Sequence, residues 1–286
     1  MQRVLADLLN VMTLERLEQN LFRGESRDIG SPQVFGGQVL GQALVAATAT
    51  VEQRAVNSLH AYFLRRGDFN RPIVYEVDRA RDGNHFSTRR VVAIQHGEQI
   101  FNMSASFQSA ESGLDHQSEM PDVPAPETLP DLGSFYLAAL DQVPPRVRRM
   151  LELERPFEFR PVRPPNDLHP QKIPPFKQVW FRAVDALPDD ADLHRCLLAY
   201  VSDFNLLDTA PMPHGVSPLQ GRLIMASIDH AMWFHRGARV DEWLLYSTDS
   251  PSSSGARGFA RGSIFTRDGR LAASTCQEGL MRLVAP

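Results

Sequence analysis

One run of the chain carries apolar side chains at helical spacing: Leu193-His194-Arg195-Cys196-Leu197-Leu198-Ala199-Tyr200-Val201-Ser202-Asp203-Phe204-Asn205-Leu206-Leu207-Asp208. Leucine and aromatic residues recur in it every three or four positions, which predicts a helix with one face packed into a core. Asp203 falls beside that face, in the row of Cys196 and Tyr200. A carboxylate buried there without hydrogen-bond donors would be strongly destabilising. Hydrogen-bond donors to Asp203 are therefore expected from other parts of the chain.

Strand-like runs surround the predicted helix. One run, residues 178–183, precedes it, and four follow it at residues 223–234, 243–248, 258–266 and 271–280. The first half has the same order. An apolar Gly- and Ala-rich helix at residues 34–51 is followed by strand-like runs at 56–64, 73–81, 86–95 and 99–108. This order predicts an α+β fold in which antiparallel sheets curl around long helices.

Local sequences repeat between the two halves. His60-Ala61-Tyr62-Phe63 is similar to His230-Ala231-Met232-Trp233-Phe234, and Ser104-Ala105-Ser106-Phe107-Gln108 is similar to Ser274-Thr275-Cys276-Gln277. The separations are 170 residues for the histidines and 169 for the glutamines. Nearly equal separations with one element order indicate a duplicated domain, so a site can exist in one copy only.

Prolines divide the two copies. Residues 121–175 contain 13 of the chain's 21 prolines, which predicts an interdomain linker with little regular structure apart from a short helix at 132–140. The predicted domains are residues 1–115 and 177–286, joined by the linker 116–176. At the N-terminus, helical spacing from residue 4 predicts a short docking helix, followed by a strand near residues 20–23.

Composition excludes several classes of partner. The 286 residues carry a formal net charge of −4 without a long basic block, which argues against nucleic acid and anionic membrane surfaces as partners. No apolar run is long enough to span a bilayer, and no signal peptide is recognisable. Two cysteines in apolar stretches favour a reducing, cytoplasmic location. Nucleotide and metal motifs are absent from the sequence, so we expect no cofactor.

Ser227 and Gln277 are the best candidate donors to Asp203. Gln277 ends an apolar strand row, and alternation places Ser227 with Asp229 on one face of its strand and His230 on the other. The same alternation argues against Asp229 and His230 acting as a catalytic pair. A carboxylate, a hydroxyl and an amide can together hold a water and take its proton. Taken singly, each of the three is more often a structural residue than a catalytic one.

Eight segments carry a resemblance to a known family: Leu21-Phe22-Arg23-Gly24, Gln33-Val34-Phe35-Gly36-Gly37-Gln38-Val39, Tyr62-Phe63-Leu64-Arg65, Arg81-Asp82-Gly83-Asn84, Ser202-Asp203-Phe204-Asn205, Ile228-Asp229-His230-Ala231-Met232-Trp233-Phe234-His235, Ser254-Gly255-Ala256-Arg257-Gly258 and Gln277-Glu278-Gly279. With them the sequence resembles the acyl-CoA thioesterase II family. The resemblance implies a double hotdog fold in one chain, hydrolysis of fatty acyl-CoA to free acid and CoA, and a homo-oligomer, dimer or tetramer.

The resemblance also implies roles for three residues. The family's Asp, its Thr or Ser, and its Gln, arranged about a water, fall on Asp203, Ser227 and Gln277. Ser227 departs from the Thr of bacterial members and lacks the methyl group that restricts the Thr rotamer. The first copy offers Gln108 but no matching Asp, which implies one working site per chain. Backbone N–H groups near Gly36-Gly37-Gln38, or at its counterpart in the second copy, are expected to stabilise the oxyanion.

Two other classes of function remain open at this point. A hotdog lyase acting on hydroxyacyl thioesters would use His60 or His230 as its acid or base. A non-catalytic acyl-CoA-binding protein would bind the same ligand without turnover, although three polar groups in one apolar pocket argue for a chemical purpose.

Overall fold

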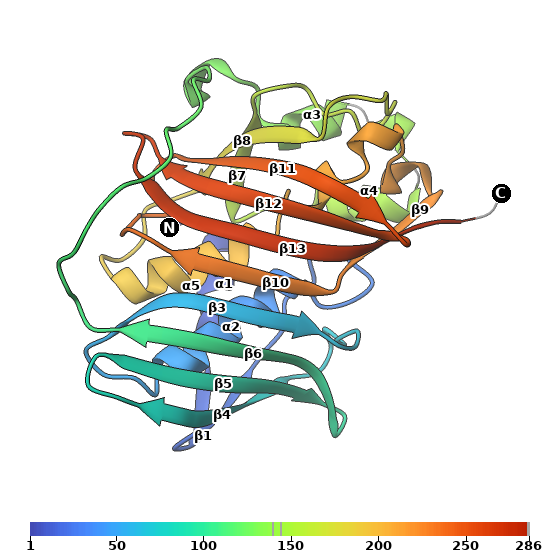
Figure 1. The fold of residues 1–286 in the computed structure, drawn as a ribbon. Helices are drawn as coiled ribbons and strands as arrows, with labels where there is room; N and C mark the ends of the chain where they lie inside the picture. Colours follow the sequence, from blue (N-terminus) through green and yellow to red (C-terminus); the bar gives the residue numbers. More distant parts are fainter. Residues whose placement is uncertain (139, 144, 285–286) are drawn as a thin grey trace.

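Two central helices lie against one curved sheet. The computed structural model describes residues 1–138, 140–143 and 145–284. The central helices are α2 (Gly36–Thr48) and α5 (Ala191–Ser202), and they pack against each other behind the strands (Figure 1). The predicted α+β double hotdog architecture is confirmed, one helix belonging to each half of the chain.

The strands follow the duplicated order. The first half contains β1 (Glu15–Glu18), β2 (Leu21–Gly24), β3 (Ala55–Phe63), β4 (Ile73–Asp82), β5 (Phe86–Gln95) and β6 (Glu98–Gln108). The second half contains β7 (Phe157–Pro161), β8 (Phe176–Ala183), β9 (Leu223–Ser227), β10 (Asp229–Phe234), β11 (Leu244–Ser254), β12 (Arg257–Thr266) and β13 (Leu271–Leu283). Antiparallel pairing connects every strand within each half.

The sheets of the two halves join edge to edge into one continuous sheet. The spatial order is β1-β2-β4-β5-β6-β3-β10-β13-β12-β11-β8-β7, with β9 also paired to β13. The junction is the antiparallel pair β3–β10, in which Ala61 lies opposite His230 and His60 opposite Ala231. The two copies of the repeated His-Ala motif are therefore neighbours across the centre of the sheet (Figure 1).

The predicted strand at 223–234 is broken at Ile228. Ser227 pairs with Gly279 on β13, whereas Ala231 pairs with Cys276, so three residues on one side face two on the other. Ile228 N–H donates to the Glu278 carbonyl, and the Ile228 carbonyl accepts from Phe63 N–H of the other half. One extra residue of this kind is a bulge, and it reverses which face the following side chains occupy.

The linker carries more structure than its prolines predict. Between β6 and β8 lie η1 (Pro126–Thr128), α3 (Leu132–Ala138), η2 (Leu140–Gln142), α4 (Pro145–Glu152) and β7, and β7 extends the second half's sheet by pairing with β8. The helix predicted at 132–140 is α3, and residue 139 lies outside the described residues. At the N-terminus α1 (Arg3–Met12) and β2 match the prediction, with β1 between them.

The helix predicted over the run 193–208 ends at Ser202. Asp190 caps its start, because its carboxylate accepts from the N–H groups of Asp192 and Leu193 at 2.9 and 3.1 Å. Asp203 is the C-terminal cap, and Asn205 then takes a left-handed φ of 64°. The apolar positions after Asp203 belong to turns, η3 (Leu207–Thr209), η4 (Met212–His214) and η5 (Pro218–Gln220), that return to the sheet. None of the helices in the described ranges is long and apolar enough to cross a membrane.

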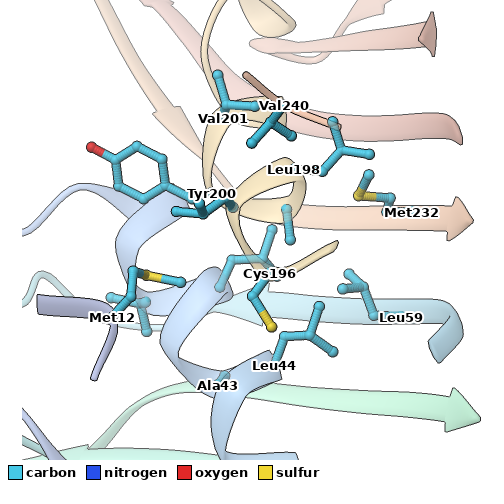
Figure 2. Packing of buried hydrophobic residues seen from close by; sticks show 14 of the residues in the cluster. Met12, Ala43, Leu44, Leu59, Cys196, Leu198, Tyr200, Val201, Met232 and Val240 are labelled. Atoms are coloured by element: carbon cyan, nitrogen blue, oxygen red, sulfur yellow. The ribbon is translucent and has the colours of Figure 1, made fainter. Parts of the chain in front are cut away.

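Close approach of α2 and α5 requires small residues. Figure 2 shows Cys196 of α5 pointing toward Leu44 of α2 in the core. A Cβ atom at Gly37 would lie 2.3 Å from the Tyr200 carbonyl oxygen, a contact that no ordinary side-chain shift relieves. The Gly-rich start of α2 therefore fixes the distance between the two helices.

Replacement of Gly37 tests this packing. The added methyl group of Gly37→Ala has to move the α5 backbone, and overpacking of this kind costs about 1 to 3 kcal/mol. Urea denaturation should show that loss in the free energy of unfolding. Gly237→Ala is the matched control, since nothing lies within 4 Å of its added Cβ. Equal stability of the two variants would contradict the packing argument.

Candidate active site

Asp203, Ser227 and Gln277 meet at the C-terminal end of α5. The Asp203 side chain is only 5% exposed. Its Oδ1 accepts from Gln277 Nε2 at 2.6 Å and from Ser227 Oγ at 3.5 Å. The first contact is a short, strong hydrogen bond, while the second is at the outer limit of one. The three residues selected from the sequence are thus assembled in one place by α5, β9 and β13.

A third donor to Asp203 comes from the first half of the chain. The backbone N–H of Gly37, in the first turn of α2, donates to the Asp203 carboxylate. A Cβ at Gly36 would lie 2.8 Å from Asp203 Oδ2, so a side chain there would occupy the carboxylate's space. The carboxylate ends α5, where the helix dipole is unfavourable to it, and faces the start of α2, where the dipole is favourable.

Burial makes Asp203 a stronger base than an exposed aspartate. Desolvation raises its pKa, and the hydrogen bonds from Gln277, Gly37 and Ser227 oppose that rise without cancelling it. A carboxylate with a raised pKa holds an abstracted proton more readily, which suits a general base. The same three donors keep the ionised form hydrogen-bonded inside the protein.

His230 fixes the orientation of the Gln277 amide. The imidazole is fully buried, and burial lowers its pKa to about 4, so it is neutral at pH 7. Its Nδ1 lies 3.2 Å from Gln277 Nε2, and its Nε2 lies 3.0 Å from Ser202 Oγ. Ser202 Oγ in turn donates to the Ala199 carbonyl at 2.9 Å. The consistent assignment has Nδ1 accepting from Gln277 and Nε2–H donating to Ser202.

The Gln277 oxygen is the open position of the site. Both hydrogens of its amide nitrogen are used, one on Asp203 and one on His230. Its Oε1 is buried and has no hydrogen-bond partner among the residues that the structure describes. A buried carbonyl oxygen in this state accepts a hydrogen bond from whatever enters the site. The amide therefore holds the carboxylate with one end and presents an acceptor with the other.

The bulge at Ile228 corrects the predicted strand faces. Continuous alternation placed Ser227 and His230 on opposite faces, but both lie near Asp203 Oδ1, at 3.5 Å and 3.9 Å. Asp229 points away from them, and its Oδ1 accepts from Glu278 N–H at 2.7 Å. Separation of Asp229 from His230 was predicted correctly, whereas separation of Ser227 from His230 was wrong. The signal for His230 was the repeated His-Ala motif. Gly37 was expected near the site as an oxyanion donor, but not as a donor to Asp203.

The described residues contain no group of three or more His, Cys, Asp or Glu side chains placed to hold a metal ion. The site consists of one carboxylate, one hydroxyl, one amide and one neutral imidazole. Such a set can position a water and accept its proton without any further group.

Comparison with known proteins identifies the family. Residues 23–108 match the family described as acyl-CoA thioesterase N-terminal domain, and residues 147–280 match the family described as acyl-CoA thioesterase. The chain is 42% identical to acyl-CoA thioesterase 2 of Haemophilus influenzae over 99% of both chains. It is 41% identical to human acyl-coenzyme A thioesterase 8 over 96% of this chain and 88% of that one.

Solved structures agree with the sequence comparison. The crystal structure of acyl-CoA thioesterase II TesB2 from Mycobacterium marinum superposes with a TM-score of 0.79 at 44% identity, over 97% of this chain and 99% of that one. The chain belongs to the acyl-CoA thioesterase II family.

The buried state of His230 predicts a pH dependence of stability. Its pKa falls from an ordinary 6.5 to about 4 on folding, so between these pH values the unfolded chain binds a proton that the folded chain does not. Stability is therefore lost as the pH falls from 6.5 toward 4, by roughly 3 kcal/mol from this group. His230→Asn should lose less stability over this window, as measured by urea denaturation at pH 7 and 4.5. Parallel stability curves for the two proteins would contradict the assignment of a neutral, buried imidazole.

Proposed function

We propose that this chain hydrolyses the thioester of acyl-CoA to free acid and CoA, with Asp203 as the general base. Membership of the family makes the chain a thioester hydrolase. The observation that supports the residue roles is the position of the Gln277 amide. It donates to Asp203 through Nε2, and its buried Oε1 has no partner within the described part of the chain. A water there can donate one hydrogen to Gln277 and the other to Asp203.

The reaction follows from that placement. Asp203 takes a proton from the water as the water oxygen attacks the thioester carbonyl carbon, and an oxyanion forms. Collapse of this intermediate breaks the C–S bond, and the proton held by Asp203 goes to the departing CoA sulfur. Ser227 donates to Asp203 Oδ1 and keeps the carboxylate in line with the water. Water is the nucleophile in this scheme, because the described residues place no imidazole within hydrogen-bond distance of the Ser227 hydroxyl, and its bond to Asp203 is a long one at 3.5 Å.

The oxyanion donors differ in part from the sequence expectation. Gly37 N–H is bonded to Asp203, and Gln38 N–H donates to the Phe35 carbonyl at 3.0 Å. The N–H of Gly36, at the same helix start, has no acceptor among the residues that the structure describes. We place the oxyanion against Gly36 N–H, next to the carboxylate and at the positive end of α2.

The positions of both candidate histidines argue against a hotdog lyase. His230 is fully buried and uses both ring nitrogens, on Gln277 and Ser202. His60 is exposed on β3, where it stacks edge-on against Trp233 at 5.2 Å. Neither imidazole is placed to exchange a proton with a substrate at Asp203.

The cytoplasmic location and the homo-oligomer stay predictions.

Asp203→Asn tests the base. The amide keeps the shape and loses the proton acceptor, so we expect thiol release from dodecanoyl-CoA to fall by about 10²- to 10⁴-fold, the usual worth of general base catalysis. The matched control is Asp229→Asn, whose side chain still accepts from Glu278 N–H and lies outside the trio. Binding of acyl-CoA by Asp203→Asn with near-native turnover would overturn the proposed role. Binding of acyl-CoA by the wild type without any thiol release would favour a non-catalytic acyl-CoA-binding protein.

The hydroxyl at position 227 sets the pH at which activity is lost. Ser227 stabilises the charged form of Asp203, so Ser227→Ala should raise the Asp203 pKa. The acid limb of the kcat/KM profile should then move to higher pH, while Ser227→Thr should leave the limb in place because the hydroxyl remains. If the pH at which kcat/KM falls in acid is the same in Ser227→Ala as in the wild type, the Ser227 hydroxyl does not act on this carboxylate.

A further inference from the structure

A cavity lies next to the Asp203 site, between the second half of the sheet and the proline-rich segment. Its volume is about 310 Å³. Phe204, which follows Asp203 directly, and Tyr200, one turn earlier on α5, form the wall nearest the site. The opposite wall comes from the predicted linker, with Leu132 on α3 and Leu151 on α4. A ligand that reacts at Asp203 therefore has this space beside it.

Aromatic packing ties the cavity wall to the catalytic groups. The Phe204 ring lies 4.2 Å from the ring of Phe35, the residue immediately before Gly36. Phe35 also contacts Tyr200, with ring centroids 5.3 Å apart, and Phe159 of β7 lies 5.6 Å from Phe204. One cluster thus borders both the carboxylate and the cavity, and β7 from the linker belongs to it.

Most of the charged groups around the cavity have partners in the protein. Lys177 Nζ donates to Asn205 Oδ1 at 2.9 Å and lies 3.7 Å from Asp208. The Tyr136 hydroxyl donates to Asp167. Arg27, Arg155 and Arg163 also line the cavity, but most of its surface comes from apolar atoms of leucine, phenylalanine, isoleucine, methionine and proline side chains. Such a surface favours an apolar ligand, since burying it releases water from both.

The volume indicates the size of that ligand. An apolar cavity of about 150 Å³ holds one benzene molecule, or six carbons. A cavity of about 310 Å³ is roughly twice as large and has room for a saturated chain of about twelve carbons.

We propose that this cavity takes the acyl chain of the substrate, that medium-chain acyl groups fit it best, and that the proline-rich segment sets the chain length through Leu132. The inference rests on the proposed function, because it places the thioester at Asp203 and the chain beyond Phe204. The segment predicted as a linker is then a wall of the substrate site. It separates the two copies in sequence and completes only the second copy's site in space.

Filling the cavity tests the proposal. Leu132→Trp extends a ring into the space, and Met212→Trp does so from η4 on the other wall. For each variant we expect kcat/KM for dodecanoyl-CoA to fall by about tenfold or more, with that for butanoyl-CoA changed by no more than about twofold. Leu137→Trp is the control, since Leu137 lies on α3 too but is 52% exposed and outside the cavity wall.

The outcomes separate this inference from the proposed function. Equal losses for both substrates in folded Leu132→Trp and Met212→Trp, or no loss in either variant, would overturn the cavity assignment. Titration calorimetry with dodecanoate supplies a readout independent of turnover: binding to the wild type and to Leu137→Trp but not to Leu132→Trp supports the assignment. If the wild type releases thiol from no acyl-CoA while dodecanoate still binds in this pattern, the proposed function fails and the cavity assignment stands.

Discussion

The contact between the start of α2 and the end of α5 is the constraint on which the site depends. Asp203 lies where the α5 dipole is unfavourable to a carboxylate and where desolvation raises its pKa. Gly37 N–H supplies a donor from the facing helix, and the absence of a side chain at Gly36 leaves room for the carboxylate. A base of raised pKa is therefore kept inside the protein by a helix that belongs to the other copy of the duplicated domain.

The ends of the two central helices differ between the two copies of the domain. The cap that follows α5 is Asp203, whereas the cap that follows α2 is Ala49. In the first copy the end of α2 is closed by Arg89, which is 1% exposed and donates to the Thr50 carbonyl at 3.0 Å and to Asp82 at 2.7 Å. The second copy has a buried carboxylate at this place, and the first has a paired cation. The first copy contributes the Gly37 N–H and the space at Gly36 to the surroundings of Asp203.

Much of this arrangement was predictable from the sequence, and the remainder depends on tertiary contacts. Helical spacing located α5, alternation placed Gln277 on an inward face, and the repeat predicted a duplicated fold. The role of Gly37 was not predictable, because it follows from how closely two helices cross and not from either helix alone. The bulge at Ile228 was also missed, since it results from β10 pairing with β3 of the other copy while β9 stays on β13.

That bulge has a direct chemical consequence. In an unbroken strand Ser227 and His230 would face opposite sides, and only one of them would reach the carboxylate. The extra residue brings both within 4 Å of Asp203 Oδ1, so the hydroxyl binds Asp203 while the imidazole fixes the Gln277 amide. Because the bulge lies where Ile228 bonds to both Phe63 and Glu278, the same segment joins the two halves of the sheet and places His230 against the Gln277 amide.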